Sequence, residues 1–239
     1  MTLRLLSVAW VTYLLAVIPF TSARGRGRLE AHRRSRLKLY GVLALSLLGL
    51  GGVTLLLDLL GEPFGLAPIS RLPSALDLLA WSAGTYSALA AAWLSRPLLR
   101  KLRGAPIAAG SSALVPTNPR EKAAFVGLAL TAGVMEEYVF RGYALFCLRE
   151  VTGSTPLAVT LATAGFGLGH AYQGWRAVLR TALGGAILVV PVLVTGSLLP
   201  SVIAHVAMDL TQGFWSREIV IGLGLAAPPD EADAAGAGP

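Results

Sequence analysis

The stretch that decides the fold is PREKAAFVGLALTAGVMEEYVFRGYALFCL, residues 119–148. It is longer than the roughly 20 mostly apolar residues that a helix needs to cross a bilayer. Near its centre it nevertheless carries the pair Glu136-Glu137, followed by Arg141. Charged groups at membrane depth are costly and are a sign of function by default. The stretch therefore predicts a spanning helix with polar chemistry inside it.

The composition of the whole chain supports a membrane protein. Of its 239 residues, 54% are hydrophobic and 14% are charged, whereas soluble domains contain about 25% charged residues. We predict an all-α fold, a polytopic transmembrane helical bundle of about seven spans. These spans are residues 3–20, 39–60, 75–95, 119–148, 156–172, 177–195 and 199–215. Residues 1–118 would supply N-terminal spans and basic loops, residues 119–215 the functional core, and residues 216–239 a C-terminal tail, disordered towards its end.

The positive charge of the chain is concentrated beside apolar segments. The net charge is +7, and the main basic groups are Arg24, Arg26, Arg28, Arg33, Arg34, Arg36 and Lys38, then Arg96, Arg100, Lys101 and Arg103. This placement is typical of cytoplasmic loops under the positive-inside rule and does not indicate a nucleic-acid partner. We expect an integral, multi-pass protein of a bacterial inner membrane, with the N-terminus outside and the C-terminus in the cytoplasm.

The two adjacent glutamates have different surroundings on a helix. Glu137 and Arg141 are i,i+4 neighbours and can pair. Glu136 points about 100° away from Glu137 because an α-helix has 3.6 residues per turn. Glu136 is thus left without a local partner, which suits a general base.

Two later spans carry the remaining polar candidates. Phe166 lies one turn before His170, and His205 lies one turn before Asp209, each pair on one helix face. Counting 1.5 Å per residue from the outer helix ends puts Glu136 and these polar groups at depths between about 10 and 21 Å. We therefore expect three helices to converge on one cavity near the middle of the bilayer.

In order along the chain, the motifs are E-E-x-x-x-R-G at Glu136, F-x-x-x-H at Phe166 and H-x-x-x-D at His205. This ordered set resembles the CAAX-processing and bacteriocin-processing family of intramembrane proteases, over about residues 119–215. The resemblance implies that Glu136 and His170 activate a water for attack on a peptide carbonyl. It also implies that Glu137 and Arg141 orient the first motif, and that His205 and the residue four positions on stabilise the oxyanion.

Asp209 departs from the asparagine found in many family members. An ionised aspartate cannot donate a hydrogen bond, and its charge would oppose an oxyanion. Either Asp209 is protonated or it orients His205. Alternatively His170, His205 and Asp209 bind a divalent metal such as zinc, whose catalytic sites use three N or O ligands and an open position. Cys147 is the only cysteine, so a cysteine-based zinc site is excluded.

Three classes of function remain open on the sequence. The first is an endopeptidase, or a transpeptidase using the same site, acting on membrane-associated and CAAX-like peptides. The second is a proton-coupled transporter, in which buried acids relay protons. The third is a non-catalytic assembly or immunity protein on the same fold. Retention of every motif residue favours the endopeptidase, with the bilayer and a membrane-associated peptide as its partners.

Overall fold

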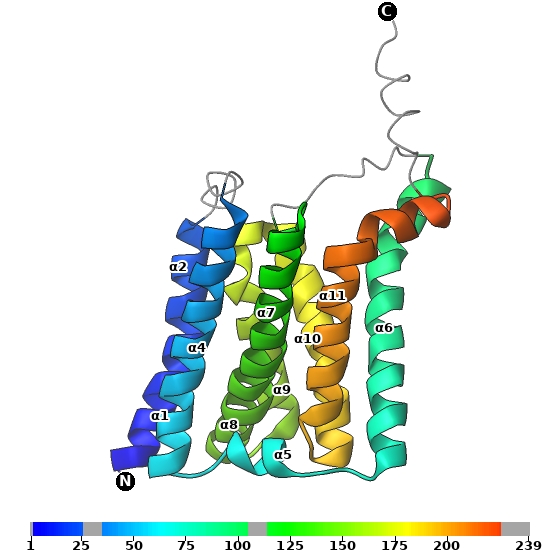
Figure 1. The fold of residues 1–239 in the computed structure, drawn as a ribbon. Helices are drawn as coiled ribbons and strands as arrows, with labels where there is room; N and C mark the ends of the chain where they lie inside the picture. Colours follow the sequence, from blue (N-terminus) through cyan, green and yellow to red (C-terminus); the bar gives the residue numbers. More distant parts are fainter. Residues whose placement is uncertain (1, 26–34, 105–113, 226–239) are drawn as a thin grey trace, which may run out of the picture.

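The chain folds into a bundle of long helices standing side by side (Figure 1). The computed structural model describes residues 2–25, 35–104 and 114–225, and these contain no β-strand. The elements are α1 (Thr2–Thr12), η1 (Tyr13–Val17), α2 (Ile18–Arg24), α4 (Arg36–Leu60), α5 (Leu66–Ser70), α6 (Ala75–Leu102), α7 (Pro119–Glu136), η3 (Glu137–Ala144), α8 (Leu145–Thr152), α9 (Thr155–Gly169), η4 (Ala171–Gln173), α10 (Trp175–Thr195) and α11 (Leu199–Gly222). The prediction of an all-α membrane bundle is confirmed.

The expected number of spans is not confirmed. Among the described residues, four continuous helical segments are long and apolar enough to cross a membrane: Thr2–Arg24, Arg36–Leu60, Pro119–Thr152 and Trp175–Thr195. The other three predicted spans also form helices. However, α9 has only 15 residues, fewer than the roughly 20 that span a bilayer, while α6 and α11 are interrupted by polar and charged side chains. The chain is an integral membrane protein, with four candidate spans among its described residues.

Local capping sets where two of these helices begin. The Ser74 hydroxyl accepts a hydrogen bond from the Asp77 backbone N–H at 3.1 Å, and the Asn118 side chain accepts one from Glu121 N–H at 3.0 Å. Both bonds satisfy helix N–H groups that otherwise lack partners. The predicted starts of α6 and α7 are thus correct. The end of α11 lies at Gly222, beyond the predicted boundary at 215, and the tail from residue 226 lies outside the described residues.

The central helices are surrounded by the others. α7 packs against α4 and α11, α9 packs against α10 and the N-terminal helix, and α6 closes the far side against α10 and α11. The short helix α5 crosses one end of the bundle and contacts η3. The buried Asp58 carboxylate anchors this crossing, because it accepts hydrogen bonds from the backbone of Gly65 and Leu66 and from the Tyr138 hydroxyl at 2.6 Å.

Candidate active site

The central helix changes its winding where the two glutamates lie. α7 ends at Glu136, and residues Glu137–Ala144 form a π-helical stretch before α8 resumes the α-helix. Every residue of this stretch is buried. π-Helical segments are rare and are frequent at functional sites. This irregularity was not predicted, since the sequence reads as a continuous apolar helix.

Glu137 links three elements. Its side chain is fully buried, and its Oε1 atom accepts a hydrogen bond from Arg141 Nη1 at 3.0 Å. The same oxygen lies 2.8 Å from His205 Nδ1 on α11. The Arg141 guanidinium in turn lies over the Phe166 ring of α9, 3.9 Å from its centroid. The i,i+4 pairing of Glu137 and Arg141 agrees with the sequence prediction. Through His205 and Phe166, the same pair connects η3 to α11 and α9.

His170 lies at the end of a helix rather than within one. It is the C-cap residue of α9, and its Nδ1 is 2.9 Å from the carbonyl oxygen of Phe166. A carbonyl can only accept, so Nδ1 carries the proton and donates it. In the neutral ring the lone pair is therefore on Nε2. Phe166 also packs its ring edge-on against the imidazole, at 5.0 Å between centroids.

Glu136 lies between the two histidines. Its Oε1 atom is 4.0 Å from His170 Nε2, and its Oε2 atom is 3.8 Å from His205 Nε2. Asp209 completes the group, with Oδ2 3.8 Å from the same nitrogen of His205. The exposed fractions of these side chains are 13% for Glu136, 20% for His170, 12% for His205 and 33% for Asp209. The structure thus brings all four predicted residues together in a partly open cluster, with Asp209 at its rim.

One contact in this cluster was missed from the sequence. Orientation of His205 by Asp209 was one of the alternatives left open on the sequence, and in the structure Nδ1 of His205 bonds to Glu137. The two residues are 68 positions apart, so no local spacing could reveal the pair. Ser22 was also missed: its hydroxyl donates to the Gly169 carbonyl at 2.6 Å and accepts from the Tyr172 N–H. Ser22 thereby holds the turn that carries His170.

The structure does not test the predicted metal set. Within the described residues, which include all four candidates, no group of three or more His, Cys, Asp or Glu side chains is arranged to hold a metal ion. The histidine nitrogens and carboxylate oxygens around Glu136 are separated by 3.8–4.0 Å. The metal set His170, His205 and Asp209 therefore stays a prediction, and the mechanism below uses no metal.

The fold and the cluster define a class: an integral membrane protein that holds two glutamates and two histidines at the centre of a helical bundle. Comparison with known families shows what part of the chain is similar to. Residues 119–211 match the family model described as type II CAAX prenyl endopeptidase Rce1-like. The match runs from the start of α7 to beyond Asp209, and it is to the same kind of protein as the resemblance seen in the sequence. No curated protein and no solved structure matched the chain.

Proposed function

We propose that the protein is an intramembrane endopeptidase that hydrolyses peptide bonds of membrane-associated, CAAX-like substrates. The observation that carries the proposal is the position of Glu136. Its carboxylate faces the Nε2 atoms of two histidines on different helices, and the Nδ1 atom of each ring is already engaged elsewhere. A carboxylate and two oriented imidazoles are the groups needed to move protons at one reacting carbonyl.

The nucleophile in this proposal is a water between Glu136 and His170. Their separation of 4.0 Å is too long for a direct hydrogen bond and suits two groups bridged by one water. The water oxygen attacks the peptide carbonyl carbon while its proton passes to Glu136. That proton then goes to the amide nitrogen as the C–N bond breaks, which leaves a carboxylic acid and an amine. His170 Nε2 orients the water through its lone pair.

His205 is proposed to stabilise the tetrahedral oxyanion. With Nδ1–H donated to Glu137, a second proton on Nε2 would make the ring a cationic donor towards the substrate oxygen. Asp209 faces Nε2 from 3.8 Å, so its charge supports that cation from the side opposite Glu137. In this proposal the Asp209 carboxylate acts through His205, whereas an asparagine at this position would donate a hydrogen bond to the oxyanion directly.

We further propose an orientation with the N-terminus outside and the C-terminus in the cytoplasm of a bacterial inner membrane. The supporting observation is that the start of α4, the end of α6 and the start of α10, which carry Arg36, Arg100 and Arg176, lie at the same end of the bundle (Figure 1). Basic residues are enriched on the cytoplasmic side of membrane proteins.

The experiment uses purified protein in liposomes with fluorescence-quenched peptides that end in a cysteine-containing CAAX sequence, either isoprenylated or unmodified. We expect wild-type protein to release a C-terminal fragment, identified by mass spectrometry, with the isoprenylated peptide preferred. In water enriched in ¹⁸O, the new carboxylate should gain one heavy oxygen. Absence of cleavage, together with proton flux across the liposome membrane, would contradict the proposal and favour the transporter.

A further inference from the structure

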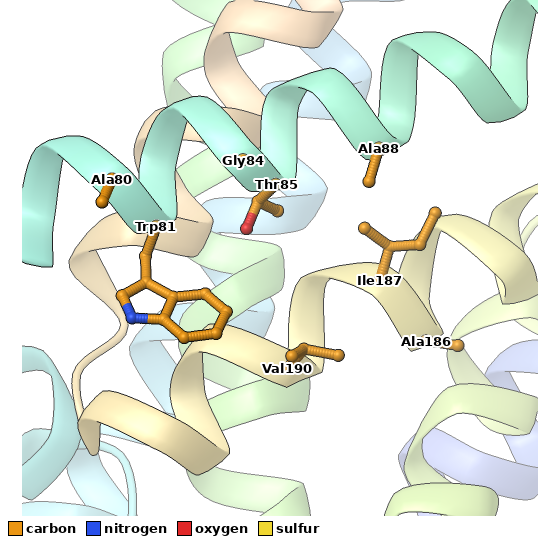
Figure 2. A pocket seen from close by; sticks show the side chains of 8 residues that line it. All are labelled: Ala80, Trp81, Gly84, Thr85, Ala88, Ala186, Ile187 and Val190. Carbon is orange, nitrogen blue, oxygen red and sulfur yellow. The ribbon is translucent and has the colours of Figure 1, made fainter.

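A large apolar cavity lies away from the candidate active site, between α6 and α10. Its volume is about 720 Å³. Figure 2 shows side chains from both helices directed into the space between them. The cavity is lined by Ala80, Trp81, Gly84, Thr85, Ala88, Ala186, Ile187 and Val190. None of these residues belongs to the Glu136 cluster, so the proposed peptidase mechanism does not use this space.

A second cavity lies between the same two helices, nearer the end of the bundle where the basic residues gather. It has a volume of about 320 Å³ and is lined by Arg96, Arg100 and Arg176. Arg180 lies one turn beyond Arg176 on α10. Within the described part of the chain, Arg96 and Arg176 form no ion pair with a carboxylate. The charges of Arg96 and Arg176 are therefore available to an external anion.

The distance between the two cavities matches the distance between the headgroup and the acyl chain of a phospholipid. Ala88 lies eight residues from Arg96 on α6, and Ala186 lies ten residues from Arg176 on α10, so the arginines are about 12–15 Å from the apolar cavity at 1.5 Å per residue. One leaflet of the hydrocarbon core is about 15 Å thick. A headgroup at the arginines would thus place its acyl chain along the apolar cavity.

We propose that the α6–α10 face binds an anionic phospholipid, with its phosphate at Arg96 and Arg176 and one acyl chain between the helices. Basic pockets between spanning helices are suited to anionic headgroups, and arginine binds phosphate oxygens in a bidentate manner. The apolar cavity offers few polar groups to a peptide backbone, whose N–H and C=O groups must be satisfied inside a membrane. Charge and lining therefore both favour a lipid over a polypeptide.

The site also contacts α11, the helix that carries two of the four catalytic candidates. Ile187, which lines the apolar cavity, packs against a core cluster that contains Ala204 and Met208 of α11. These residues flank His205 and Asp209 in sequence. A bound lipid would therefore stabilise the packing of α6, α10 and α11 together.

The test is native mass spectrometry of the full chain released from micelles containing equal amounts of phosphatidylglycerol and phosphatidylethanolamine. Wild-type protein should retain phosphatidylglycerol preferentially. The double variant Arg96→Gln/Arg176→Gln should lose most of this preference, since a basic side chain near an anionic lipid surface contributes about fivefold. Gly84→Leu should lose it too, because a Cβ atom added at Gly84 meets nothing within 4 Å and would project into the cavity.

Matched controls separate this site from general effects of charge or size. Arg120→Gln/Lys122→Gln removes two exposed charges near the start of α7, and Gly52→Leu adds a side chain at another open glycine, on α4. Both controls should keep the wild-type preference, and circular dichroism should show the same helix content in all variants. Equal retention of both lipids by wild type, or equal loss in controls and site variants, would overturn the proposal.

Discussion

At the scale of single residues, two adjacent glutamates have different surroundings because neighbouring side chains on a helix point about 100° apart. Glu137 is fully buried and bonded to Arg141 and His205, whereas Glu136 faces two histidine nitrogens from 3.8 to 4.0 Å. The sequence predicted the Glu137–Arg141 pair and the freedom of Glu136 from helix geometry alone. It could not predict that Glu137 also holds His205, because that contact depends on how α7 and α11 pack.

Replacing Glu137 with Gln should destabilise the protein strongly. The change removes one charge of a buried pair and leaves Arg141 buried without compensation, which costs about 3–5 kcal/mol. Thermal unfolding in detergent, followed by circular dichroism, would measure the loss. Glu150→Gln, at an exposed carboxylate on α8, should leave the melting temperature nearly unchanged. Equal melting of the two variants would show that the Glu137–Arg141 pair does not hold the bundle.

The role of Asp209 can be separated by its side-chain chemistry. Asp209→Asn should keep peptidase activity within about tenfold of wild type, since an amide can donate directly to an oxyanion. Asp209→Leu can neither donate nor support a cation on His205, so activity should fall by more than about tenfold. Initial rates of peptide cleavage in liposomes check both. Full activity of Asp209→Leu would remove this residue from the site.

At the scale of helices, the site depends on close packing between its elements. Two glycines of α9 permit close approach of its neighbours: a Cβ atom added at Gly165 would collide with Leu15, and one at Gly167 would lie 2.8 Å from Ala182 Cβ and 3.0 Å from the Val178 carbonyl oxygen. Gly169 is different, since its nearest neighbour would be at an ordinary 3.8 Å. The spacing of small residues predicts that two helices are in contact. Which glycine lies at the contact depends on the position at which the two helices cross.

Gly167→Ala should therefore be destabilising. The added methyl group meets α10 backbone, which cannot move away as a flexible side chain would, and overpacking of this kind costs about 1–3 kcal/mol. Gly184→Ala on α10 is the matched control, because its Cβ atom would be 3.7 Å from the tip of Leu89. The control should be neutral or slightly stabilising, as alanine favours helix over glycine. A thermal melt that ranks the two variants the other way would contradict the packing described for α9 and α10.

At the scale of the whole molecule, apolar composition sufficed to predict a membrane bundle but not its number of spans. Hydropathy identifies helices that are long and apolar enough to cross a membrane, and four such segments are found among the described residues. α9 and α11 line the site instead and carry or support His170, His205 and Asp209. His205 and Asp209, which make α11 less apolar, are thus also candidate catalytic residues. The π-helical stretch η3 escaped prediction for another reason, because its residues read as part of one continuous apolar helix; in the structure it contacts α4, α5 and α9.

The proposed orientation makes a prediction for labelling of intact cells. Cys147 is buried in the structure, so the native chain should react weakly with a membrane-impermeant maleimide. Ser70→Cys, between α4 and α6, should be labelled in intact cells, whereas Gln173→Cys, between α9 and α10, should be labelled only after permeabilisation. Both positions have exposed side chains. Reversed labelling would place the basic end of the bundle outside and contradict the orientation.

The measurement that tests the central claim most directly is cleavage by wild type and Glu136→Gln, each with and without a chelator. Removing a general base lowers rates by about 10²–10⁴-fold, so Glu136→Gln should lose at least about a hundredfold while Glu218→Gln, an exposed carboxylate on α11, retains full activity. Wild-type cleavage should be unchanged by the chelator. Activity lost on chelation and restored by zinc would contradict the account and assign His170, His205 and Asp209 to a metal, whereas undiminished cleavage by Glu136→Gln would remove the proposed base altogether.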